Sequence, residues 1–224
     1  MKSMFKNLGM LLTALGLLSL VSFVCLKQQK KTVVCFGDSI TYGALVDGHS
    51  WVWYLQQQKD SPLSYINAGR SGRRTSDRKE LPPVLEKYPD ASMYVFFLGV
   101  NDLKDGNDSM VSSCLDNMQW MIDQVHNKAP QAKVLLLAPA DINTKEMNEI
   151  NKKKLYNENT RSSLKALAAG YKTLAEKNNA DYLSLLKVVP KHAYADGLHP
   201  NAEGQEALFE AINKKINEYY AASR

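Results

Sequence analysis

Short apolar runs alternate along the chain with longer segments in which apolar residues recur every three or four positions. The runs at 93–98 and 133–138 are apolar at nearly every position, which is typical of central strands covered on both faces. The run at 32–36 is rich in β-branched residues and is followed by a glycine. The pattern predicts five strands, at residues 32–36, 64–68, 93–98, 133–138 and 181–185.

Helical periods lie between and after these runs. From residue 111 to residue 125, apolar residues are spaced alternately four and three positions apart, which forms one stripe of a helix. Similar stripes cover residues 164–175 and 208–216. Asn201, directly after Pro200, is a suitable N-cap for the last of these helices. The sequence therefore predicts three long amphipathic helices.

Alternation of strands and helices implies right-handed crossovers, and hence a parallel sheet with helices on both faces. No internal repeat or low-complexity linker interrupts the alternation. We therefore expect one three-layer α/β domain over residues 32–224. Because ligands of such sheets bind beyond the carboxyl ends of the strands, candidate chemistry is sought directly after each strand.

The charge of the chain is concentrated near its start. Residues 1–31 hold five lysines and no acidic residue, which leaves 23 of the 28 basic residues against all 23 acidic ones. The net charge of +5 is thus a property of the first segment, and the predicted domain is neutral. Charge therefore gives no reason to expect a nucleic-acid partner.

The first segment resembles an export signal. Lys2 and Lys6 precede an uncharged stretch from residue 8 to residue 26, which is also nearly long enough to span a bilayer. Three interpretations of residues 1–31 stay open: a cleaved signal peptide, an uncleaved membrane anchor, and a lipoprotein signal ending at Cys25, although the residues before Cys25 fit lipidation poorly. All three predict an exported protein, either periplasmic or extracellular.

Cysteines are sparse in the predicted domain. Cys35 lies in an apolar run and Cys114 in a helical stripe, so both are expected to be buried free thiols. No cysteine and histidine spacing suggests zinc. A site formed by His192, Asp196 and His199 is conceivable, but we expect neither a metal nor a cofactor.

Polar motifs follow the predicted strands at the positions where the fold would place a site. A serine hydroxyl needs an adjacent base to act as a nucleophile, and Ser39 follows the first strand. His199 could supply that base, with Asp196 holding its tautomer. Backbone N–H groups of Ser39 and Gly69 and the amide of Asn101 could bind an oxyanion. Each motif alone also fits an ordinary turn, whereas their occurrence together and in order favours a catalytic site.

The four motifs together resemble those of the SGNH hydrolases, also called GDSL esterases. The matching blocks are G-D-S at Ser39, N-x-G-x-S-G at Gly69, G-x-N-D at Asn101, and D-x-x-H at Asp196 and His199. The resemblance extends over residues 32–218. It implies a flavodoxin-like fold with strand order 2-1-3-4-5. It further implies Ser39 as nucleophile, His199 as base, Asp196 as its orienting acid, and Ser39, Gly69 and Asn101 as oxyanion donors.

Two clusters near these blocks could contact substrate. Arg70 and Arg73, with two further arginines, follow Gly69 and could bind an anionic group, but they also fit a solvated basic loop. Trp51, with Trp53 and Tyr54, could stack on a sugar ring, but this spacing also fits a helix packed on the sheet. Asp38 and Asp102 lie inside the blocks and are interpreted as scaffolding.

The resulting hypothesis is a serine esterase that forms an acyl-enzyme and needs no cofactor. No lid or large apolar insertion separates the blocks, which favours short acyl groups such as acetyl esters of carbohydrates. Two alternatives remain: a lysophospholipase or thioesterase acting on lipid acyl chains, and a non-catalytic glycan-binding module. The sequence does not indicate an oligomeric state.

Overall fold

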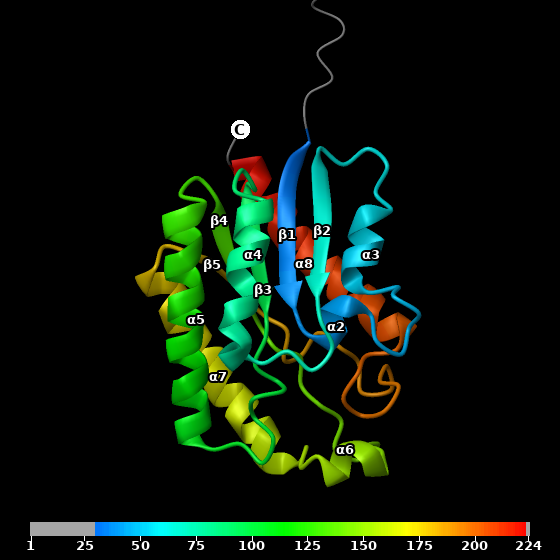
Figure 1. The fold of residues 1–224 in the computed structure, drawn as a ribbon. Helices are drawn as coiled ribbons and strands as arrows, with labels where there is room; N and C mark the ends of the chain where they lie inside the picture. The colour runs from blue at the N-terminus through cyan, green and yellow to red at the C-terminus, as the bar shows by residue number, and fades with distance from the viewer. Residues whose placement is uncertain (1–29, 223–224) are drawn as a thin grey trace, which may run out of the picture. The chain divides into compact units, whose positions relative to one another are not determined.

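The computed structural model describes residues 30–222, and in this part of the chain a five-stranded parallel sheet forms the centre. The strand order is β2-β1-β3-β4-β5, as the resemblance implied (Figure 1). All five predicted strands are confirmed, with ends that differ by at most one residue. They are β1 (Lys31–Gly37), β2 (Leu63–Gly69), β3 (Met93–Phe97), β4 (Lys133–Ala138) and β5 (Asp181–Ser184).

Helices cover both faces of this sheet, and Figure 1 shows α4 and α5 in front of it and α8 behind. The three predicted amphipathic stripes lie in α5, α7 and α8, and Asn201 accepts a hydrogen bond from the N–H of Gly204 at 3.1 Å, as its predicted capping role requires. The helices are α2 (Ser39–Tyr42), α3 (Trp51–Gln56), η1 (Thr75–Glu80, a 3-10 helix), α4 (Leu81–Lys87), α5 (Asp108–Lys128), α6 (Glu149–Lys153), α7 (Glu158–Lys177) and α8 (Ala202–Ala222).

Alternate residues of β1 belong to two separate cores. Val34 and Phe36 pack with buried residues of α4, α5 and α7, whereas Val33 and Cys35 pack with those of α3 and α8. All five residues of β3 are buried, because this strand lies inside the sheet with helices on both faces. The two cores fix the sheet between its helices and hold the carboxyl ends of β1 and β3 side by side.

Two short helices that sequence periodicity did not predict, α2 and α6, lie beyond the carboxyl ends of the strands (Figure 1). The arrowheads of β1 and β2 point toward the edge of the domain where α2 and α6 lie (Figure 1). Both helices are too short, at four and five residues, to show a hydrophobic period.

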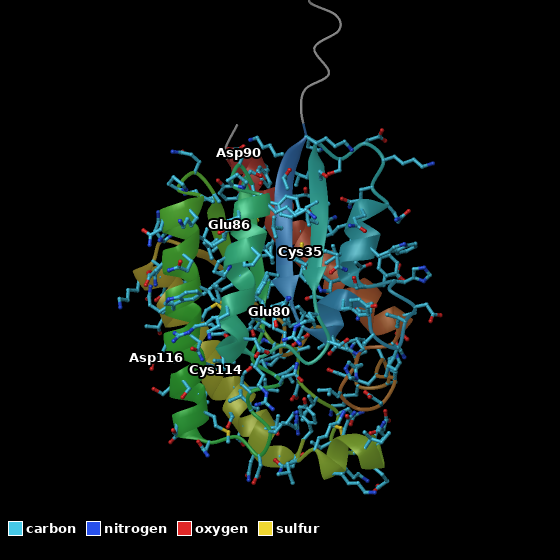
Figure 2. All side chains as sticks on the ribbon, in the orientation of Figure 1. Cys35, Glu80, Glu86, Asp90, Cys114 and Asp116 are labelled. Carbon is cyan, nitrogen blue, oxygen red and sulfur yellow. The ribbon has the colours of Figure 1, made fainter. Side chains whose placement is uncertain are left out.

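Cys35 and Cys114 are buried free thiols, as predicted. Figure 2 labels them on different elements, β1 and α5. Residues 1–29 of the proposed leader lie outside the described residues, whereas Lys31 is the first residue of β1. No helix within residues 30–222 is long and apolar enough to cross a membrane.

Candidate active site

The turn between β1 and α2 presents Ser39. Asp38 caps α2, because its Oδ1 accepts a hydrogen bond from the N–H of Ile40 at 2.9 Å. Ser39 is the first residue of the helix, so its N–H has no acceptor four residues back within that helix. A Cβ on Gly37 would lie 2.1 Å from the hydroxyl of Thr41, which explains why only glycine fits where the chain turns into α2.

The imidazole of His199 lies between Ser39 and Asp196. The Ser39 Oγ and His199 Nε2 atoms are 3.0 Å apart, and His199 Nδ1 lies 2.9 Å from Asp196 Oδ2. A serine, a histidine and a carboxylate thus form one hydrogen-bonded line, the arrangement that a nucleophilic serine requires. The structure brings all three predicted catalytic residues together.

Asp196 receives hydrogen bonds on both carboxylate oxygens. Its Oδ1 accepts from the N–H groups of Leu198 and His199, at 3.0 and 2.7 Å, and its Oδ2 accepts from the amide of Asn151 at 2.8 Å. Burial alone would raise the pKa of Asp196, but the hydrogen bonds and charge of His199, together with the Asn151 bond, outweigh burial and hold this pKa well below its usual range. Asp196 is therefore ionised and available to stabilise an imidazolium.

Asp38 has the opposite environment. It is fully buried, its Oδ2 has no hydrogen-bond partner among the described residues, and burial raises its pKa to about 7. Asp102 accepts from both the N–H and the hydroxyl of Thr75, at 3.0 and 2.6 Å. Both contacts fit the interpretation of Asp38 and Asp102 as scaffolding, since one caps a helix and the other anchors the start of η1.

The two further candidate oxyanion donors come from the ends of β2 and β3. The N–H of Gly69 donates to Asn67 Oδ1 at 2.9 Å, so in this state it is already bonded. A Cβ on Gly69 would lie 2.4 Å from the backbone nitrogen of Tyr42, which shows how closely the end of β2 approaches α2. Asn101 is 7% exposed, and its amide donates one hydrogen bond to the carbonyl of Arg73 at 3.1 Å.

Three functional candidates were not found by sequence reasoning. The hydroxyl of Tyr156 donates to Asn101 Oδ1 at 2.7 Å, and Asn151 donates to Asp196 as described above. Gln205, at the start of α8, accepts from the N–H of Trp51 and donates to the carbonyl of Ile40, at 3.0 and 3.2 Å. These residues lie in no motif, and an isolated Asn, Tyr or Gln carries no sequence signal of its own.

The structure gives Arg73, a predicted substrate contact, partners inside the protein. Its side chain is only 7% exposed, and its guanidinium donates to the carbonyls of Gly37 and Ala68 and pairs with Glu80. The guanidinium also lies over the Phe36 ring, 4.0 Å from its centroid. Arg73 therefore ties the ends of β1 and β2 together, because buried strand-end carbonyls need donors.

Arg70 is more exposed, but its charge is already paired. Its guanidinium bonds Asp77 at 2.8 Å and Glu80 at 2.7 Å. Two carboxylates thus neutralise the charge of Arg70, and its role in substrate binding stays a prediction.

Trp51, the other predicted substrate contact, lies in the core instead. Trp51 has no exposed surface and packs beside Phe97, with ring centroids 6.3 Å apart. It is the first residue of α3 and faces the sheet, so the alternative interpretation of this aromatic cluster as a packed helix face holds for Trp51. Within residues 30–222, no three His, Cys, Asp or Glu side chains are grouped so that they could bind a metal ion. His192, which was considered beside Asp196 and His199, bonds Glu203 at 2.8 Å.

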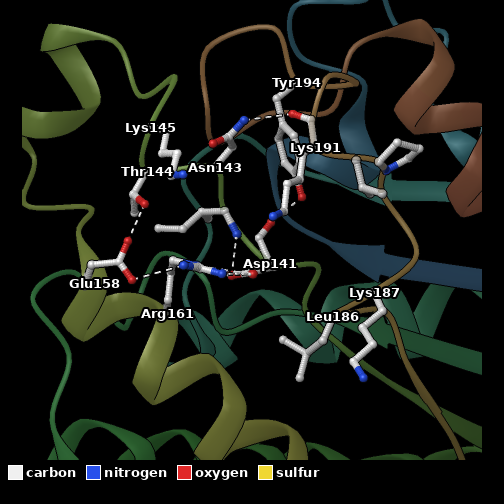
Figure 3. A pocket seen from close by; sticks show the side chains of 13 residues that line it. Asp141, Asn143, Thr144, Lys145, Glu158, Arg161, Leu186, Lys187, Lys191 and Tyr194 are labelled. Carbon is white, nitrogen blue, oxygen red and sulfur yellow. Dashed lines mark hydrogen bonds and ion pairs between the residues drawn. The ribbon is translucent and has the colours of Figure 1, made fainter.

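A pocket of about 420 Å³ lies between the segments that follow β4 and β5 (Figure 3). Figure 3 shows Arg161 between Asp141 and Glu158, both of which it bonds. The pocket borders the segment that carries the histidine, because Tyr194 lines it and the N–H of Asn143 donates to the carbonyl of Gly197 at 2.7 Å. Its lining combines charged groups with the apolar side chains of Ile142, Leu186, Val189 and Pro190.

Comparison with known proteins supports the assignment that the motifs suggested. A carbohydrate acetylesterase from Sinorhizobium meliloti, Est24, has a similar fold, with a TM-score of 0.73 and 22% identity over 85% of this chain and 100% of that one. The native aryl esterase of M. smegmatis is similar at a TM-score of 0.72 and 22% identity, over 84% of this chain and 99% of that one. No curated protein sequence matches the chain significantly. Residues 35–207 match the GDSL-like lipase/acylhydrolase family, and the chain therefore belongs to this family of SGNH ester hydrolases.

Proposed function

We propose that the protein hydrolyses short-chain O-acyl esters, including acetyl esters of carbohydrates, through an acyl-enzyme on Ser39. The observation that carries the proposal is the line of hydrogen bonds from Ser39 through His199 to Asp196, with distances of 3.0 and 2.9 Å. A base within hydrogen-bond reach of the hydroxyl is the geometric requirement for general-base activation.

The reaction has two halves. In the first, Ser39 Oγ attacks the ester carbonyl while its proton passes to His199 Nε2, and Asp196 stabilises the resulting imidazolium. The tetrahedral intermediate then expels the alcohol, which takes the proton from His199. In the second half, His199 removes a proton from water, the hydroxide attacks the acyl-enzyme, and the acid leaves as Ser39 regains its proton.

The oxyanion of each tetrahedral intermediate is placed at the N–H of Ser39 and the amide of Asn101. The first lies in the opening turn of α2 and the second in the loop after β3. The N–H of Gly69 joins them once it is released from Asn67 Oδ1, which now accepts it at 2.9 Å. The first two donors are in position before the reaction, so they stabilise the developing charge without further reorganisation.

The proposed preference for carbohydrate esters has two supports. One is the fold shared with an enzyme named as a carbohydrate acetylesterase. The other is the pocket beside the histidine segment, where Asp141, Glu158 and Arg161 offer polar groups for sugar hydroxyls next to apolar side chains. Hydrolysis of lysophospholipids or thioesters in the same site, and glycan binding without catalysis, are the alternatives.

Activity toward p-nitrophenyl acetate, acetylated polysaccharide and a lysophospholipid, compared between the wild-type and Ser39→Ala proteins, tests the proposal. We expect acetate release that Ser39→Ala abolishes, and a rate that falls as the acyl chain lengthens in a p-nitrophenyl ester series. Undiminished activity in Ser39→Ala would refute the assignment of Ser39 as the nucleophile. A preference for long chains would favour the lipid alternative, and failure of a fluorophosphonate to label Ser39 would favour the binding module.

We further propose that the protein acts outside the cytoplasmic membrane, because Lys2 and Lys6 precede an uncharged stretch of export-signal type. Cell fractionation of the full chain tests this, with Cys25→Ala as a probe for lipidation. Recovery of the protein in the cytosol would contradict the proposal.

A further inference from the structure

We propose that the turn from Asn151 to Tyr156 is a single brace that holds both the catalytic acid and the oxyanion amide in place. In this inference, Asn151 and Tyr156 are positioning residues: neither is required to touch substrate, and each acts through another side chain. The inference rests on the proposed function, because it takes Asp196 and Asn101 in the roles given above.

The Asn151 end of the brace fixes the plane of the Asp196 carboxylate. Asn151 is 2% exposed, and its amide donates to Asp196 Oδ2 at 2.8 Å, the same oxygen that faces His199 Nδ1. Asn151 is itself held by Asn148, the N-cap of α6, whose Oδ1 accepts the Asn151 N–H at 2.8 Å. Asn148 also donates its own N–H to the carbonyl of Asp196 at 3.1 Å, so α6 contacts both the backbone and the side chain of the acid.

The Tyr156 end sets the direction of the Asn101 amide. Tyr156 is 3% exposed, and its hydroxyl donates to Asn101 Oδ1 at 2.7 Å. The Asn101 amide gives one N–H to the carbonyl of Arg73, which leaves its second N–H for an oxyanion. Because the terminal torsion of asparagine is broad, an amide without these anchors can rotate and present its oxygen, which would repel the oxyanion.

A backbone hydrogen bond also joins the Asn151 and Tyr156 ends of the brace. The N–H of Tyr156 donates to the carbonyl of Asn151 at 3.2 Å, which closes the turn directly between the two positioning residues. Leu155 inside the turn has a φ of 66°, a left-handed conformation that is unfavourable for leucine and persists only where surrounding contacts hold it. One such contact is the N–H of Asp105, which donates to the carbonyl of Leu155 at 2.8 Å.

The first experiment removes only the hydroxyl at the oxyanion end. Tyr156→Phe keeps the ring in the core and should lower kcat for p-nitrophenyl acetate about tenfold, with KM changed less than twofold, because the loss falls on the transition state. Tyr182→Phe is the matched control, since its hydroxyl donates a 2.8 Å hydrogen bond to the carbonyl of Ala168 away from the site. Tyr182→Phe should keep kcat within twofold, and the melting temperatures of both variants show whether they differ in stability.

A double-mutant cycle separates positioning from general damage. If Tyr156 acts through Asn101, Tyr156→Phe should cost nothing further in an Asn101→Ala background. The brace is overturned if Tyr156→Phe has wild-type kcat, or if it lowers kcat by the same factor in both backgrounds. Wild-type kcat in Asn101→Ala alone would overturn the proposed oxyanion role and this half of the brace with it, so the two failures are distinguishable.

The acid end is tested in the same way. Asn151→Ser should lower kcat several-fold, and the effect should vanish in an Asp196→Asn background. Asn178→Ser is the control, because Asn178 likewise donates a 2.8 Å hydrogen bond, to the carbonyl of Leu174 at the end of α7. An equal loss in Asn178→Ser, or an unchanged effect of Asn151→Ser when Asp196 is replaced, would refute the acid end of the brace.

Discussion

The hydroxyl of Ser39 and the imidazole of His199 are 160 positions apart in the chain, yet their Oγ and Nε2 atoms lie 3.0 Å from each other. Ser39 follows β1, which lies between β2 and β3 in the sheet, and His199 lies on the segment that leads into α8. Gln205 of α8 reaches the α2 region through the carbonyl of Ile40 at 3.2 Å. This fully buried side chain thus helps to hold the two ends of the domain together beside the proposed nucleophile.

Replacement of Asn101 by alanine should lower kcat by roughly 10²–10³, the usual cost of one oxyanion donor. KM should change little, because the charge that the amide stabilises develops only in the transition state. Steady-state kinetics with p-nitrophenyl acetate measure both constants. A loss of less than threefold would count against Asn101 as a donor.

Replacement of Asp196 by asparagine should lower kcat at least tenfold, because an amide cannot stabilise the imidazolium as a carboxylate does. The change should also alter acid stability. The pKa of Asp196 is depressed in the folded protein, so its carboxylate contributes stability above the unfolded pKa of about 4 and loses it as the pH falls through the folded value.

Urea unfolding of the wild-type and Asp196→Asn proteins at pH 7 and at pH 3 checks the stability part of this prediction. The stability advantage of the wild type should be smaller at pH 3. An advantage that grows on acidification would contradict the environment described for Asp196.

Replacement of Asp38 by asparagine should remove a pH dependence of the free energy of unfolding whose sign is opposite to that of Asp196. The pKa of Asp38 is raised to about 7, so the neutral acid is fully compatible with the fold below pH 4, and stability is lost as the pH rises toward 7. The three-unit difference corresponds to about 4 kcal/mol at most, at 1.4 kcal/mol per unit. Asparagine keeps the cap on α2 and carries no charge.

The free energy of unfolding of both proteins at pH 5 and pH 8 measures this effect. Asp38→Asn should lose less stability between the two pH values than the wild type does. Parallel losses in the two proteins would show that the buried carboxyl is not the group responsible.

Replacement of Arg73 by alanine should destabilise the fold by about 3 kcal/mol, because the carbonyls of Gly37 and Ala68 lose a charged donor inside the protein. Arg70→Ala is the matched comparison, since the Arg70 side chain is 45% exposed and also pairs with Glu80. An exposed ion pair of this kind contributes less than about 1 kcal/mol. Chemical denaturation measures both, and equal costs would contradict the buried role of Arg73.

The linear order of residues was enough to predict the framework of the domain. Its pattern of apolar and polar positions predicted the five strands to within one residue. The signal is strongest for β3 and β4, because a strand buried on both faces must be apolar along its length. Its four motifs predicted the family and the triad, because catalysis needs particular residue types at the carboxyl ends of those strands. The leader and the natural substrate stay predictions.

The different roles of neighbouring residues of the same type emerge only in the folded protein. Arg70 and Arg73 look alike in the sequence, yet one pairs at the surface and the other closes the ends of two strands. Asn151 and Tyr156 lie in no motif, and their roles arise from contacts with Asp196 and Asn101, which are 45 and 55 positions away. Burial and hydrogen-bond partners depend on what the fold brings alongside a residue, and a local pattern does not contain that information.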